Sequence, residues 1–101
     1  MLFEVYGLPV NKKGESAGSQ SVEAAFAEVV RLYSNRLSRL LVYFERCTKD
    51  DAQAFKCRAS AIFTDWTSVH VDAVDVSVEA AVDDAAHQLQ RTLSAIIDPP
   101  G

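Results

Sequence analysis

The chain has 101 residues, a formal net charge of −4 and an apolar content of 49%. This length supports one domain with a single modest core. The sequence contains no apolar run near the roughly 20 residues that a membrane-spanning helix needs, and Met1-Leu2-Phe3-Glu4 lacks the basic and apolar regions of a signal peptide. We therefore expect a single cytoplasmic domain over residues 1–101 that has no membrane partner, with a flexible loop at 8–20 and a tail at 98–101.

Charge is distributed unevenly along the chain. Residues 31–58 carry a net charge of +4, whereas residues 59–101 carry −6. The basic residues thus gather in the middle of the chain and the acidic residues in its last third.

The first third of the sequence predicts a strand, a loop and a helix. Leu2 to Tyr6 alternates in the manner of a short strand, and residues 7–20 have the Gly-rich and Ser-rich composition of a loop. No Gly-Lys-Ser/Thr follows the glycines, so this loop is not a phosphate-binding loop. Ser21 is a suitable N-cap for a helix. The apolar residues of that helix recur at helical spacing and are Val22, Ala25, Phe26, Val29 and Tyr33.

The rest of the chain predicts three strands and a second helix. The strands cover residues 36–47, 54–63 and 68–74, and the first two are joined by a hairpin loop at about residues 48–54. The helix covers residues 77–97, and Pro99 and Pro100 prevent its continuation. Its apolar stripe comprises Val78, Ala81, Val82, Ala85, Leu89, Leu93 and Ile96.

These elements predict an α+β fold, a two-layer sandwich in the order β-α-β-β-β-α. Strands one and two should be parallel, strands two to four should form an antiparallel meander, and both helices should cover one face of the four-stranded mixed sheet. The other face stays open. Side-chain alternation places these residues on the open face: Arg39, Leu41, Tyr43, Glu45, Lys56, Arg58, Ser60, Ile62, His70 and Asp72.

Residue types that support catalysis or metal binding do not converge in this pattern. Cys47 and Cys57 should face opposite sides of the sheet, which predicts two free thiols rather than a disulfide. His70 and His87 lie on different elements, and neither has a second ligand at metal-binding spacing. We therefore predict no enzyme activity, no metal, no cofactor and no small-molecule substrate.

Two stretches resemble the single-domain ribosome hibernation-promoting factor and ribosome-associated inhibitor family. Residues 78–93 (VEAAVDDAAHQLQRTL) are similar to the family's acidic-x-Ala-Val/Ile-Asp…Ala…Lys-Leu-x-Arg-x-Leu signature. Residues 33–40 (YSNRLSRL) are similar to its Phe-x-Asp-Arg-Ile-x-Arg-Val motif at the start of strand two. The resemblance covers most of residues 22–97.

The resemblance implies the fold of a double-stranded RNA-binding domain and a protein that occupies the tRNA and mRNA channel of the small ribosomal subunit. Such a factor inhibits translation in stressed or resting cells, with rRNA as its partner. Lys and Arg side chains would then neutralise rRNA phosphates. The candidate residues for that role are Arg36, Arg39, Lys56, Arg58 and Arg91.

An alternative is a divergent member of that family without rRNA binding. The last helix carries Glu79, Asp83 and Asp84, and the tail is Asp-Pro-Pro-Gly rather than basic. Such a protein would form a homodimer or dock another protein through its open sheet face. The candidate residues for that interaction face are Tyr6, Leu41, Tyr43, Ile62 and His70.

Trp66 lies in the turn predicted between the last two strands. A single Trp can pack over a sheet edge or mark a contact surface. We expect packing, because a large aromatic side chain usually contacts a hydrophobic wall.

Overall fold

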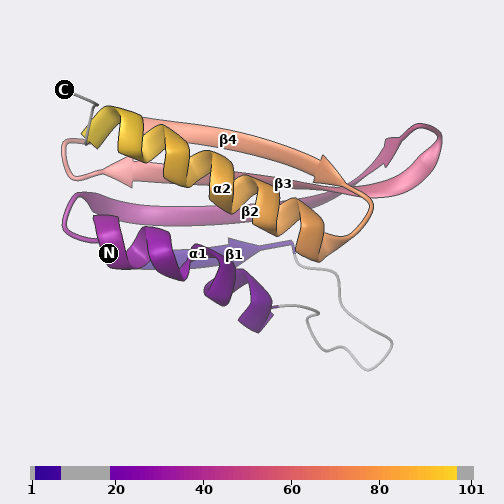
Figure 1. Cartoon of the computed structure of the whole chain (residues 1–101), viewed down its shortest axis with the longest axis horizontal. Coiled ribbons are helices and arrows are strands. Elements are labelled where there is room, and N and C mark those ends of the chain that lie inside the picture. The colour runs from indigo at the N-terminus through magenta and orange to yellow at the C-terminus, as the bar shows by residue number, and fades with distance from the viewer. Residues whose placement is uncertain (1, 8–18, 98–101) are drawn as a thin grey trace.

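The computed structural model describes residues 2–7 and 19–97. Its elements follow the predicted order: β1 (Leu2–Tyr6), α1 (Ser19–Tyr33), β2 (Leu37–Lys49), β3 (Ala52–Phe63), β4 (Ser68–Asp75) and α2 (Val78–Ile97). The strands form one sheet in the order β1-β2-β3-β4. Figure 1 shows both helices lying across the same side of this sheet. The α+β two-layer fold is therefore confirmed.

Strand directions also agree with the prediction. β1 runs parallel to β2, with Phe3 opposite Leu40 and Val5 opposite Val42. β2, β3 and β4 form an antiparallel meander. A shift in register between Leu37 and Arg39 marks a β-bulge near the start of β2.

The core lies between the helices and the covered face of the sheet. Phe26 of α1 is fully buried, and its ring centroid lies 6.2 Å from that of Phe3 in β1. Small side chains face each other where α2 crosses β3 and β4, which allows the helix to approach the sheet closely. These buried alanines are Ala59, Ala61, Ala73, Ala81, Ala85 and Ala86.

Local chemistry explains the ends of two elements. α2 begins after Ser77, whose hydroxyl accepts a hydrogen bond from the backbone N–H of Ala80 at 3.1 Å. β1 is followed by Gly7, which has a φ of 77°. A Cβ atom at this position would clash with the backbone carbonyl oxygen of Phe44, so only glycine fits here.

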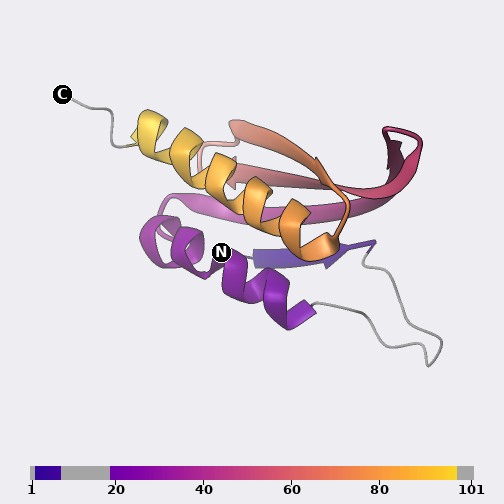
Figure 2. The same ribbon diagram turned by 45° about the vertical axis from the view of Figure 1, so that its right-hand side comes forward.

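The predicted hairpin loop at 48–54 is wrong. β2 continues to Lys49 and β3 begins at Ala52, so only Asp50 and Asp51 form the turn. Their φ values are 53° and 62°, the left-handed conformation that both central residues of a type I′ turn require. Aspartate tolerates this conformation better than most residues. The resulting hairpin extends past the ends of both helices (Figures 1 and 2).

Three smaller predictions need comment. α1 begins at Ser19 rather than after Ser21, so the predicted loop is shorter; residues 8–18 and the tail at 98–101 lie outside the described residues. Ile96 was placed in the buried stripe of α2 but is 53% exposed. Cys47 and Cys57 are free thiols, as predicted. Burial raises the pKa of Cys57 to about 12, with a further contribution from the negative charge of Asp72.

Candidate nucleic-acid interface

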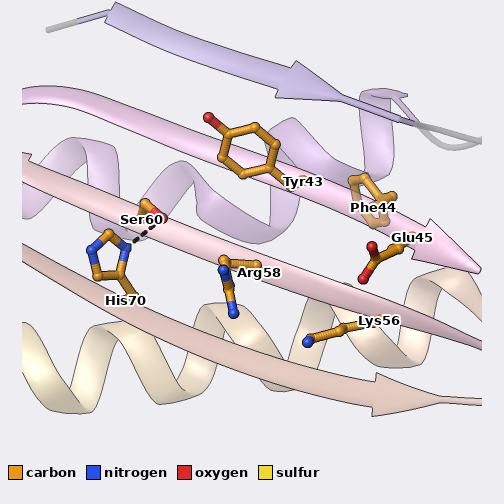
Figure 3. Close-up of a pocket in the computed structure, with 7 residues that line it drawn as sticks. All are labelled: Tyr43, Phe44, Glu45, Lys56, Arg58, Ser60 and His70. Carbon is orange, nitrogen blue, oxygen red and sulfur yellow. Dashed lines mark hydrogen bonds between the residues drawn. The ribbon is translucent and has the colours of Figure 1, made fainter. Parts of the chain in front are cut away.

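The sheet surface opposite the helices, called the open sheet face below, carries most of the predicted functional residues. Strand pairing arranges its side chains in rows across the sheet. One row is Glu4, Leu41, Ser60 and His70, and the next is Tyr6, Tyr43, Arg58 and Asp72. In Figure 3 the helices lie behind these strands, and Tyr43, Arg58 and His70 of these rows are exposed.

A broad depression of about 650 Å³ occupies the centre of the open sheet face (Figure 3). Tyr43, Arg58 and Lys56 point from its floor toward solvent. Among the described residues, its lining consists of Tyr43, Phe44, Glu45, Lys56, Arg58, Ser60 and His70. Both signs of charge and the aromatic rings of Tyr43 and Phe44 therefore meet in this depression.

Arg58 forms a two-pronged ion pair with Asp72 on the neighbouring strand. Its Nε lies 2.8 Å from Asp72 Oδ1, and its Nη2 lies 3.4 Å from Oδ2. The hydrogen bond from Arg58 holds the pKa of the Asp72 carboxyl below its ordinary value. Both side chains are exposed, so water screens the pair and its contribution to stability is small.

The other two cations of the open sheet face also have acidic neighbours. Arg39 Nη2 lies 3.6 Å from Glu4 Oε1, and Lys56 is the register partner of Glu45. Cations and carboxylates therefore balance on this surface.

His70 is held by hydroxyl groups on both sides of its ring. Its Nδ1 lies 2.7 Å from Ser60 Oγ, and its Nε2 lies 3.2 Å from Ser68 Oγ. Ser60 is only 4% exposed, so His70 provides the hydrogen-bond partner that this buried hydroxyl needs. Within residues 2–7 and 19–97, no cluster of three His, Cys, Asp or Glu side chains could hold a metal ion.

Tyr6 and Tyr43 form a stacked pair beside Arg58. Their ring centroids lie 5.3 Å apart, with an angle of 19° between the ring planes. The two residues remain 46% and 40% exposed. An aromatic platform next to a guanidinium can accept a nucleobase or an apolar side chain of a partner protein.

The five predicted phosphate-binding cations do not share one surface. Arg39, Lys56 and Arg58 lie on the open sheet face. Arg36 lies in the turn between α1 and β2, and Arg91 lies exposed on α2, which covers the other side of the sheet. The five residues predicted for the interaction face, by contrast, lie together on the open sheet face: Tyr6, Leu41, Tyr43, Ile62 and His70.

The expectation that Trp66 packs over the sheet edge is wrong. Trp66 is 79% exposed and has a φ of 73°. The sequence marked it as a turn residue but could not reveal its exposure, because the turn directs the side chain away from the sheet. The sequence pattern also does not single out Glu4 and Asp72, the carboxylates that pair with arginines on the open sheet face.

Comparisons with known proteins give a match in structure. No family model matches the chain, and no curated protein matches its sequence. A ribosomal subunit interface protein from Coxiella burnetii superposes with a TM-score of 0.74 at 16% identity, covering 97% of this chain and 99% of that one. The Protein Y N-terminal domain from Thermus thermophilus superposes with a TM-score of 0.64, also at 16% identity, covering 93% and 94%.

At 16% identity the agreement concerns the path of the backbone. The chain therefore has, over nearly its whole length, the fold of the ribosomal subunit interface protein and of the Protein Y N-terminal domain.

Proposed function

We propose that this protein is a ribosome-associated factor of the hibernation type. It would occupy the tRNA and mRNA channel of the small ribosomal subunit and inhibit translation by steric exclusion, in the cytoplasm and without a chemical step. The observation that carries this proposal is the agreement in fold, along 97% of the chain, with a ribosomal subunit interface protein. The fold likeness extends over the same residues as the sequence resemblance.

The exposed cations supply the chemistry that rRNA binding needs. Arg39, Lys56 and Arg58 line the open sheet face, and Arg36 adds a cation in the turn that precedes β2. Arg91 lies on α2, on the opposite side of the sheet, and does not belong to this surface. Exposed ion pairs are worth only about 0–1 kcal/mol, so a phosphate group can replace Asp72 on Arg58 or Glu4 on Arg39 at little cost. The displaced carboxylates remain nearby, which predicts moderate affinity with a strong dependence on salt.

Co-sedimentation with purified small subunits over a series of salt concentrations tests this proposal. Binding should weaken steeply as salt rises, because phosphate neutralisation releases counterions. Lys56→Gln should reduce the slope of log affinity against log salt by about one. Arg31→Gln is the matched control, because Arg31 is an exposed cation on α1 that pairs with Glu28; it should leave the slope unchanged. Excess tRNA should displace the protein from the subunit.

Absence of binding at low salt would contradict the proposal, as would binding that salt does not weaken. Binding that tRNA cannot displace would contradict the channel location alone.

A second candidate function follows from the charge balance of the open sheet face. Equal numbers of cations and carboxylates, together with the exposed Tyr6–Tyr43 stack, also suit the docking of a protein or of a second copy of this chain. In that case the sedimentation experiment would show no ribosome association. Light scattering would then give the mass of two chains for a homodimer, and Tyr43→Lys would return it to one.

A further inference from the structure

The turn between β3 and β4 exposes the only tryptophan of the sequence. Trp66 is 79% exposed, the highest value among the large apolar side chains described. The turn itself is well ordered by hydrogen bonds. Phe63 N–H donates to Thr67 O at 2.8 Å, and Trp66 N–H donates to Phe63 O at 3.0 Å. The indole is therefore presented to solvent on a defined loop.

The backbone of Trp66 is unfavourable for a bulky residue. Its φ of 73° lies in the left-handed region, which Gly, Asn and Asp adopt far more readily. In short hairpins this position is usually glycine. Within the turn Trp66 combines a strained backbone with an exposed apolar surface, and neither property helps the fold. Such outliers persist mainly where function requires them.

A cation lies beside this turn. Thr64 N–H donates to the carbonyl oxygen of Arg36 at 3.0 Å, which joins the β3–β4 turn to the α1–β2 turn. The two turns lie at the same end of the sheet, at the left of Figure 1. Arg36 is exposed, and within the described residues it forms no ion pair.

The acidic residue of the turn, Asp65, accepts its hydrogen bonds from within the turn. Asp65 Oδ1 accepts hydrogen bonds from Thr67 N–H at 3.1 Å and from Thr67 Oγ1 at 2.6 Å. These bonds hold the pKa of Asp65 below its ordinary value, so the carboxylate remains charged while it orders the loop. Its position toward Thr67 leaves the indole face accessible.

We propose that Trp66 and Arg36 form a contact site for unpaired RNA, in which the indole stacks on a nucleobase and the guanidinium binds an adjacent phosphate. Aromatic stacking and guanidinium–phosphate contacts are the usual means by which proteins hold single-stranded RNA. The inference rests on the proposed function for its source of RNA, the small ribosomal subunit. It adds a specific contact at the end of the sheet, outside the open sheet face.

Trp66 fluorescence tests the site directly, since no other tryptophan contributes to the signal. Short single-stranded RNA should quench the emission of the whole protein at low salt, and duplex RNA of the same length should quench it much less. Arg36→Gln should weaken the single-stranded titration and reduce its salt slope by about one. An absence of quenching by single-stranded RNA would overturn the inference.

Ribosome co-sedimentation gives the second readout. Trp66→Ala should weaken binding about tenfold, the loss expected for one stacked base, and Trp66→Phe should restore most of it. Leu32→Ala is the matched control, because Leu32 is 45% exposed on α1; it should bind as the wild type does.

The outcomes separate this inference from the proposed function. If the wild type binds small subunits and Trp66→Ala binds equally well, the Trp66 site alone is wrong. If Trp66→Ala loses binding while naked RNA fails to quench, the indole docks on a ribosomal protein and the RNA contact is overturned. If the wild type does not bind subunits, the proposed function fails, and the RNA titration alone decides the inference.

Discussion

Trp66 shows how one residue can lower stability while adding a contact surface. A non-glycine residue in the left-handed region costs about 1–2 kcal/mol, and Trp66 has a φ of 73° there. Glycine removes this strain, but its greater conformational freedom in the unfolded chain lowers stability by about 0.5–1 kcal/mol. Trp66→Gly should therefore raise the free energy of unfolding by about 0.5–1 kcal/mol, measured by urea denaturation. Little burial is lost, because the side chain is 79% exposed.

Trp66→Ala separates strain from side-chain contacts. Alanine keeps the backbone penalty, so its stability should stay close to that of the wild type. A loss of stability in both variants would mean that the indole packs against the protein in solution, and the strain argument would then fail.

The ionic contacts of single residues illustrate what the sequence could not predict. The alternation of apolar and polar residues correctly placed Arg39 and Arg58 on the open sheet face, because a strand exposes every second side chain to the same side. Their partners, Glu4 and Asp72, became visible only with the strand register. The Arg39 pair requires β1 parallel to β2, and the Arg58 pair joins residues 14 apart in sequence.

At the scale of elements, α2 depends on a defined start. Ser77 Oγ accepts the N–H of Ala80 at 3.1 Å, and its carbonyl accepts the N–H of Ala81 at 3.1 Å. Ser77→Ala removes the side-chain acceptor and should lower the free energy of unfolding by about 1 kcal/mol. Thermal unfolding followed by circular dichroism measures this loss.

Ser94 provides the matched control within the same helix. It is exposed in the last turns of α2. Alanine favours a helix more than serine does at such a position. Ser94→Ala should leave stability unchanged or raise it slightly. Equal losses from both substitutions would contradict a specific capping role for Ser77.

Element types were easier to predict than element ends. Helical spacing and strand alternation reflect which side chains are buried, and burial determines the element type along most of the chain. These patterns therefore identified both helices and all four strands. The ends depend on local backbone conformations. Asp50 and Asp51 close the β2–β3 hairpin in left-handed conformations. The composition of the sequence does not reveal these conformations, so the predicted loop at 48–54 is longer than the observed turn. Ile96 follows helical spacing but is 53% exposed, whereas its neighbour Ile97 packs against the core.

At the scale of the whole molecule, acidic charge is concentrated on the helix layer. The net charge is −4, while the open sheet face carries matched cations and carboxylates. Asp83 and Asp84 are exposed on α2. A ribosome-bound orientation would therefore keep α2 away from rRNA phosphates, and its negative field would still slow the approach of the protein.

Charge reversal on α2 tests this long-range effect. Asp83→Lys combined with Asp84→Lys brings the net charge of −4 to zero without altering the open sheet face. Association with small subunits should become about tenfold faster at low salt, and the difference should vanish near about 1 M salt, where the screening length is only about 3 Å. Stopped-flow measurement of the association rate gives this comparison. The neutral pair Asp83→Asn and Asp84→Asn should produce about half of the effect on a logarithmic scale, because it changes the charge by half as much. A gain that persists at high salt would instead mean that the new lysines contact rRNA directly, and that α2 forms part of the interface.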